Sequence, residues 1–327
     1  MSAAPGPTGD ERREGSGDEA VGLAGLVTES VRPELANLDL LGPDDLVSLM
    51  TAEPQRAVDA VRRAAPAIAA AVKAATACLA AGGRMLYVGA GSAGRLGVLD
   101  AAELGPTFDL PGGVVEAVMA GGDRALRHAV EGAEDDRHEG AATMRRGGVG
   151  AGDIVVGISA SGRTPFVLGA LEEAGALGAA TVAISCNAAS PIGLAADHPI
   201  DIVVGGEVLA GSSRMNAGTA QKIVLNIIST AVMVQLGKTY GNLMVDMRPT
   251  NGKLRDRARR IVASVAGVSP SAAAEALGSA GWNTKLACLL ARTGTSPDEA
   301  TAALEATGGK LRAAIELLAP GPTGNDS

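Results

Sequence analysis

The chain has 327 residues, with 28 Lys and Arg against 36 Asp and Glu, and its formal net charge is −8 at pH 7. This acidic balance, with no basic cluster, argues against a nucleic-acid-binding protein. Hydrophobic residues make up 46% of the chain and aromatic residues only 2%. We therefore expect a large core of Ala, Val, Leu and Ile, in which helices lie close on a sheet.

The cysteines and the apolar runs indicate the cellular compartment of the protein. Cys78, Cys186 and Cys288 lie far apart, with no disulfide or metal-type spacing, so we expect reduced thiols and no metal site. The first twenty residues combine mixed charge with Gly and Pro and predict a disordered tail, not a signal peptide. The longest apolar run, residues 223–236, has polar interruptions and is too short to span a bilayer. We expect a cytoplasmic protein without a membrane partner.

Three segments precede the first strand. Residues 28–39 contain Arg32-Pro33 and little periodicity, which predicts an extended arm, and a short helix is expected at about 43–51. Residues 54–81 are Ala-rich and stop at Gly82-Gly83, which predicts one long helix.

The first strand, residues 85–88, runs into a glycine-rich turn that includes Gly91 and Ser92. The GxGxxG spelling resembles a dinucleotide fingerprint, which also needs an acidic residue at the end of the second strand. That strand, near 114–119, is followed by two glycines and Asp123, which is loosely placed for a ribose. A turn that binds a phosphate or a sugar is therefore favoured over a nicotinamide site.

A second such turn follows the predicted strand at 153–158. It carries the hydroxyls of Ser159, Ser161 and Thr164 together with Gly162, and Pro165 suits the first position of a helix, with Thr164 as N-cap. Unpaired N–H groups at that helix start would form an anion site with the hydroxyls. The alternative is an ordinary turn, since Ser, Gly and Thr are common turn residues.

Two acidic stretches lie between these turns. Glu103 has apolar neighbours and precedes Gly105-Pro106, where we expect the helix to end; desolvation there would suit a general acid. Glu134 lies among other acidic residues at 131–136. Each stretch has the simpler interpretation of a solvated surface.

Further strands are expected at 181–185 and 200–204. Alternating strands and helices predict an α/β fold with a parallel doubly wound sheet and a ligand site at the carboxyl ends of the strands. Ser212, Ser213 and Arg214 precede the most apolar helix and suit either a polar ligand or a helix cap. After an extended stretch at 241–250, three or four helices are expected up to about 318, as a lid, interface or interaction module.

Six motifs in order carry a family resemblance: GAGSAGRLGVLDAAELGPTF, AVEGAEDD, GISASGRTP, AISCN, GSSRMNAGTAQK and YGNLMVDM. From about Thr28 to Leu318 the chain resembles the N-acetylmuramic acid 6-phosphate etherases of the sugar-isomerase (SIS) fold group. The resemblance implies a three-layer αβα parallel sheet with an N-terminal helical arm and a small C-terminal helical bundle. We expect a tail at 1–20, a SIS catalytic domain at 21–250, a helical domain at 251–318 and a loose tail at 319–327.

The implied activity is cleavage of the lactyl ether of N-acetylmuramate 6-phosphate to N-acetylglucosamine 6-phosphate and D-lactate, in cell-wall sugar recycling, by a homodimer without a cofactor. Elimination across C2 and C3 of the ring-opened sugar needs a base and an acid, and water then adds back. The resemblance assigns these roles to Glu103, as proton donor, and Glu134. It assigns phosphate binding to Ser92, Ser159, Ser161, Gly162 and Thr164, and other substrate contacts to Gly91, Arg163, Ser212, Ser213 and Arg214.

Two positions depart from the family pattern. The first turn reads Ser92-Ala93, with one hydroxyl fewer than usual, and we hypothesise that Ser159 replaces it. Asn216 stands where Lys is common, which removes a charge near the expected site and leaves Arg214 as the candidate partner for the lactyl carboxylate.

Two other classes of protein share these features in part: a non-catalytic phosphosugar regulator, like the glucokinase regulatory protein, and a phosphosugar isomerase. Retention of both glutamates favours the etherase.

Overall fold

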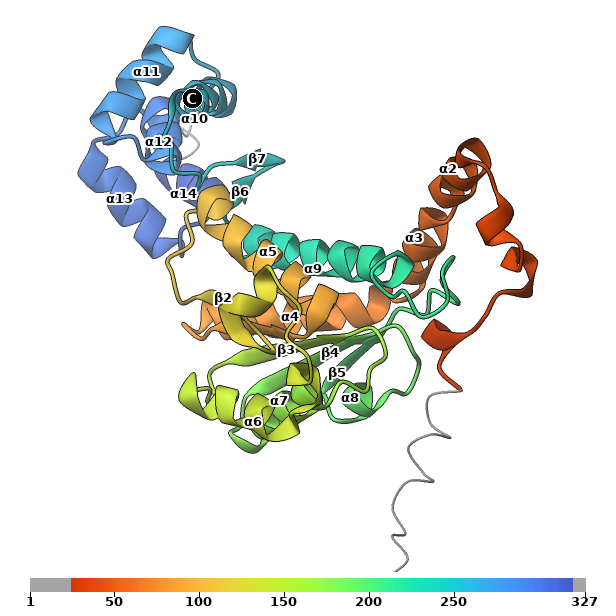
Figure 1. Ribbon diagram of the computed structural model, residues 1–327. Helices are drawn as coiled ribbons and strands as arrows, with labels where there is room; N and C mark the ends of the chain where they lie inside the picture. The colour runs from red at the N-terminus through yellow and green to blue at the C-terminus, as the bar shows by residue number, and fades with distance from the viewer. Residues whose placement is uncertain (1–24, 320–327) are drawn as a thin grey trace, which may run out of the picture.

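The computed structural model describes residues 25–319 (Figure 1), so the predicted tail at 1–20 and residues 320–327 lie outside it. Its central sheet has five parallel strands in the order β2-β1-β3-β4-β5. The strands are β1 (Met85–Gly89), β2 (Val115–Met119), β3 (Ile154–Ser159), β4 (Ala180–Ser185) and β5 (His198–Asp201). The predicted parallel, doubly wound sheet is confirmed.

Helices cover both faces of this sheet, because successive residues of a buried strand point to opposite sides. Tyr87 and Val156 face one helical layer, whereas Val88 and Val155 face the other. The first layer contains α3 (Pro54–Arg63), α4 (Ala65–Ala80), α5 (Gly91–Phe108) and α9 (Asn216–Gln235). The second contains α6 (Arg137–Arg146), α7 (Pro165–Ala176) and α8 (Pro191–Leu194). The result is the expected three-layer αβα arrangement (Figure 1).

A second helical unit follows the short hairpin of β6 (Thr239–Tyr240) and β7 (Leu243–Met244). It projects beyond the C-terminal end of α9 and has its own buried cluster (Figure 1). Five helices build it, not three or four: α10 (Gly252–Ala266), α11 (Pro270–Ser279), α12 (Thr284–Thr293), α13 (Pro297–Ala306) and α14 (Leu311–Leu318). Gly267 and Gly294 end α10 and α12 in the left-handed conformation that favours glycine.

The N-terminal segments differ from two expectations. The arm is not extended but folds into three short 3-10 helices, at Val27–Glu29, Pro33–Leu35 and Leu38–Leu40, before α2 (Pro43–Ala52). The single long helix expected at 54–81 breaks at Ala64, and the helical segments on either side differ in direction by 62°. Pro66 explains the break, since it has no N–H for the Arg62 carbonyl.

Helix α9 also differs in length. It has 20 residues and is long and apolar enough to cross a membrane, judged by length and composition alone. Among the described residues, two bent helix pairs would pass the same test if each pair counted as one span. The expectation that this segment is too short is therefore wrong. However, 56% of its most apolar window is buried, and it packs on α3, α4 and α5, as expected of a core helix. Strand β5 likewise spans 198–201 and not 200–204.

Candidate functional site

A polar cavity of about 490 Å³ opens at the carboxyl ends of β1 and β3. The chain crosses from β1 to β2 on one side and from β3 to β4 on the other, so the loops after β1 and β3 diverge and leave a crevice. Eight of the residues assigned from the sequence line this cavity: Gly91, Ser92, Glu134, Ser159, Ser161, Arg163, Thr164 and Ser213. The two glycine- and hydroxyl-rich turns do face one another across the sheet edge.

The loop after β3 is organised around the buried Ser159 hydroxyl. Its Oγ lies 2.7 Å from Thr164 Oγ1 and 3.3 Å from Ser161 Oγ, and accepts a hydrogen bond of 3.0 Å from the Gly162 N–H. Gly162 has φ of +71°, and a Cβ there would lie 2.3 Å from Ser190 Cβ, so only glycine fits. Thr164 holds the predicted N-cap position of α7, although its side chain makes no capping hydrogen bond.

The loop after β1 brings a second helix start to the cavity. Ala90 is extended, α5 begins at Gly91, and Gly89 and Gly94 approach so closely that a Cβ on Gly89 would lie 2.7 Å from Gly94 Cα. Ser92 is the second residue of α5 and lines the cavity. Two helix N-termini with unpaired N–H groups and several hydroxyls therefore surround one space, which suits a phosphate.

The two glutamates assigned as acid and base lie in different places. Glu134 is in a 3-10 turn (Ala133–Asp135) after Gly132 and lines the cavity beside Asp135. Glu103 is exposed on α5 and lies outside the cavity lining. It is eleven residues beyond Ser92, which is about 16 Å along a helix axis. In the single chain Glu103 is not desolvated as expected. The expected helix end at Gly105-Pro106 is wrong, because α5 continues through Pro106 to Phe108.

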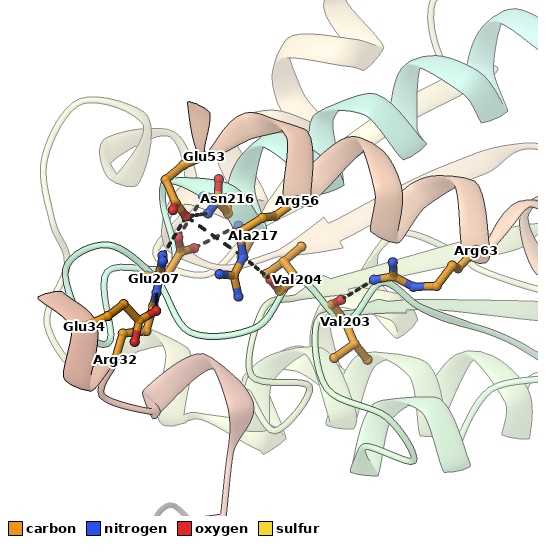
Figure 2. Close-up of polar contacts among 10 residues, drawn as sticks. All are labelled: Arg32, Glu34, Glu53, Arg56, Arg63, Val203, Val204, Glu207, Asn216 and Ala217. Atoms are coloured by element: carbon orange, nitrogen blue, oxygen red, sulfur yellow. Dashed lines mark hydrogen bonds and ion pairs between the residues drawn. The ribbon is translucent and has the colours of Figure 1, made fainter. Parts of the chain in front are cut away.

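The segment 205–215 contributes Ser213 to the cavity and is held by a polar network (Figure 2). The Glu207 carboxylate accepts hydrogen bonds from the backbone N–H of Asn216, at 3.0 Å, and of Ala217, at 2.9 Å, and so caps α9. Glu53 accepts from Arg32 Nη1 at 2.7 Å and from Asn216 Nδ2 at 3.1 Å. The network thus ties the N-terminal arm to the start of α9.

Asn216 points into this network and does not line the cavity. At this position, where the family pattern has Lys, the side chain thus serves the network and contributes no atom to the described cavity. Ser212 and Arg214 also lie outside its lining; Arg214 borders a neighbouring hollow with Ser92 and Arg95. The Gly162 side of the loop faces Ser190 rather than the cavity.

The sequence reasoning missed three polar residues of the lining: Thr28, Glu29 and Gln221. Thr28 is buried and contacts Asn187 of the loop after β4. The Asn187 Nδ2 donates to Thr28 Oγ1 at 3.2 Å, and the Asn187 Oδ1 accepts from the Val27 N–H at 2.8 Å. Gln221 belongs to the GSSRMNAGTAQK motif, which was the available signal.

Comparison with known proteins gives the family. Residues 67–175 match the model of the glucokinase regulatory protein N-terminal SIS domain, and residues 127–231 match the SIS domain model. An N-acetylmuramic acid 6-phosphate etherase from Rubrobacter xylanophilus is 54% identical over 293 residues, covering 90% of this chain and 97% of that protein. One from Deinococcus radiodurans is 48% identical and covers 87% and 93%.

Among solved structures, a phosphoheptose isomerase from Francisella tularensis aligns with a TM-score of 0.47 at 24% identity, over 58% of this chain and 97% of that one. This likeness is too distant to bear on the site.

Proposed function

Because the chain belongs to the N-acetylmuramic acid 6-phosphate etherase family, we propose that it cleaves the lactyl ether of N-acetylmuramic acid 6-phosphate to give D-lactate and N-acetylglucosamine 6-phosphate. The observation that carries the proposal is the single cavity in which Glu134 faces the two phosphate-type loops. A phosphosugar held there by its phosphate would extend its carbon chain toward a carboxylate.

The loops after β1 and β3 bind the substrate phosphate. The N–H groups at the starts of α5 and α7 and the hydroxyls of Ser92, Ser161 and Thr164 donate to its oxygens. Ser159 contributes by fixing the loop, since its hydroxyl already contacts Ser161, Thr164 and Gly162. Arg163 lies on the same lining and adds positive charge.

The reaction needs one proton removed and one supplied. In the ring-opened sugar the C1 aldehyde acidifies the C2 proton; a carboxylate removes it, the C2–C3 double bond forms as the C3–O bond breaks, and a carboxylic acid protonates the departing lactate oxygen. Water then adds at C3 while a proton returns to C2. Two glutamates suffice for both halves, each contributing about 10²- to 10⁴-fold. We assign them to Glu134 and Glu103.

The assignment of Glu103 requires a second copy of the chain. Glu103 is exposed and about three helical turns from the Ser92 end of α5, so it does not reach the cavity of its own chain. We propose a homodimer in which Glu103 of one copy completes the cavity of the other. An isologous twofold contact would complete both cavities at once.

The proposal also covers the cellular compartment and the domain boundaries. We propose that it works in the cytoplasm, where phosphorylated amino sugars are metabolised. A division into a catalytic domain, proposed at 21–250, and a helical domain, proposed at 251–318, is supported by the separate buried cluster of the second unit, which also takes in Val245 and Met247 from before that boundary.

Release of D-lactate tests the proposed function. The purified protein should release D-lactate from N-acetylmuramic acid 6-phosphate, and Glu134→Gln should abolish it. Glu131→Gln, in the same acidic stretch but outside the cavity lining, should retain most of the activity. Binding of the phosphosugar without lactate release would instead indicate a regulator. An isomerised phosphosugar that keeps its lactyl group would indicate an isomerase.

A further inference from the structure

The amide of Gln221 is a buried donor without a partner. The residue lies in the second turn of α9, is 1% exposed and lines the cavity, and its Nε2 makes no hydrogen bond within residues 25–319. A buried unpaired donor is costly and rare in native proteins, and a ligand in the cavity that Gln221 lines would give it an acceptor. Because α9 is a rigid core helix capped by Glu207, the donor is held in place before the ligand arrives.

Glu29 supplies an acceptor to the same cavity. Its carboxylate has no hydrogen bond or ion pair with any described residue, and it lies against Gly211, where a Cβ would be 3.0 Å from Glu29 Oε2. Its backbone is fixed on both sides: Asn187 holds Val27 and Thr28, and Arg32 bonds Glu53. The position of Glu29 is therefore defined although its side chain is exposed.

A phosphate or the lactyl carboxylate would be repelled by Glu29. A hydroxyl group can donate and accept, but it has only one oxygen atom for both contacts, whereas an amide places its acceptor and its donor on separate atoms. An uncharged amide offers both a carbonyl acceptor and an N–H donor. We propose that Gln221 and Glu29 form the subsite for the acetamido group: Gln221 Nε2 donates to its carbonyl oxygen, and the Glu29 carboxylate accepts from its N–H. This inference rests on the proposed function, since the acetamido group belongs to that substrate.

Binding of two phosphosugars to the full chain tests this subsite. N-acetylglucosamine 6-phosphate carries the acetamido group, and glucose 6-phosphate has a hydroxyl in its place. In titration calorimetry, Gln221→Met should weaken binding of the first about tenfold, the effect of one lost hydrogen bond, and leave binding of the second unchanged. Glu29→Ala should show the same selective loss. Matched controls are Gln235→Met, exposed at the other end of α9, and Asp39→Ala, exposed on the arm.

Thermal unfolding separates ligand recognition from a structural role. Gln221→Met removes an unpaired buried amide with little change in volume, so the Tm of the ligand-free protein should stay the same or rise. An equal loss of affinity for both phosphosugars, no loss for either, or a fall in Tm with unchanged affinities would overturn the acetamido subsite. Failure of the wild type to release D-lactate would instead overturn the proposed function, whatever the variants bind.

Discussion

Ser159 connects the phosphate loop to the end of β3, and its hydroxyl contacts Ser161 and Thr164 while accepting from the Gly162 N–H. Ser159→Ala should therefore raise KM for the phosphosugar about tenfold, the effect of one or two lost hydrogen bonds, with a smaller change in kcat. Steady-state D-lactate release measures both constants. An unchanged KM would remove the hypothesis that Ser159 replaces the hydroxyl absent at Ala93.

Asp153 makes the stability of the sheet depend on pH. Its Oδ2 lies 2.6 Å from Arg84 Nη2. Burial by itself would raise the pKa of Asp153, but hydrogen bonds from the Arg84 side chain and from the Gly150 and Arg84 N–H groups outweigh it, and the pKa is lowered. A lowered folded pKa gives stability that is complete above the unfolded value of about 4 and is lost as pH falls through the folded value.

Urea unfolding of Asp153→Asn at pH 6, 4 and 3 checks this sign. The wild type should lose more stability than the variant between pH 6 and pH 3. Parallel losses in the two proteins would show that Asp153 contributes nothing to acid sensitivity.

The residues of the site were predictable where local sequence decides their place. Ser159, Ser161 and Gly162 follow a buried β-branched strand and precede a proline-started helix, so their position at a sheet edge follows from the chain itself. Glu29 gave no such signal, and Gln221 was marked only by the GSSRMNAGTAQK motif. Their places depend on contacts between distant segments, such as Val27 with Asn187, which are 160 positions apart.

At the scale of elements, Asp100 connects β1, α5 and α9. Its Oδ2 accepts from the Tyr87 hydroxyl at 2.9 Å, and its Oδ1 accepts from Asn226 Nδ2 at 2.6 Å and Ser229 Oγ at 3.2 Å. Burial, reinforced by the Asp100 charge and hydrogen bond, raises the pKa of Tyr87 well above its ordinary value, so the phenol stays a donor. The network sets the direction of α5 and hence the place of Ser92.

Asp100→Ala should lower the free energy of unfolding by about 2 to 4 kcal/mol, because two buried donors, Tyr87 and Ser229, and the partly buried Asn226 lose their acceptor. Asp59→Ala on α3 is the matched control: this half-buried carboxylate contacts only the surface side chains of Gln55 and Arg62, so the change should cost less than about 1 kcal/mol. Denaturant unfolding measures both. Equal stabilities for the two variants would contradict the role of Asp100 as the link between these elements.

Element boundaries were predictable to the extent that single residues fix them. Four of the five strands lie within one or two residues of their predicted positions, since short β-branched runs mark buried parallel strands. The break at Ala64 was also visible, in Pro66, but the Ala-rich composition outweighed it in the prediction. Pro106 was expected to end its helix, but α5 continues past it to Phe108.

At the scale of the whole molecule, the sequence indicated the sheet but not how the cavity is completed. The cavity draws on the arm, four loops and α9, and the pattern of each segment alone does not reveal that they meet. Glu103 is exposed in a single chain, whereas a catalytic role needs it beside the substrate. The proposed homodimer would bring Glu103 of one chain to the cavity of the other, so that each acid–base pair combines residues of two chains.

Co-expression of two inactive variants tests this central claim most directly. Glu103→Gln and Glu134→Gln chains, carrying different affinity tags, should each release almost no D-lactate alone. If each cavity combines Glu134 of one chain with Glu103 of the other, the mixed dimer keeps one intact cavity, and a random mixture should recover about a quarter of wild-type activity. Isolated mixed dimers that remain as inactive as the single variants would contradict the shared site.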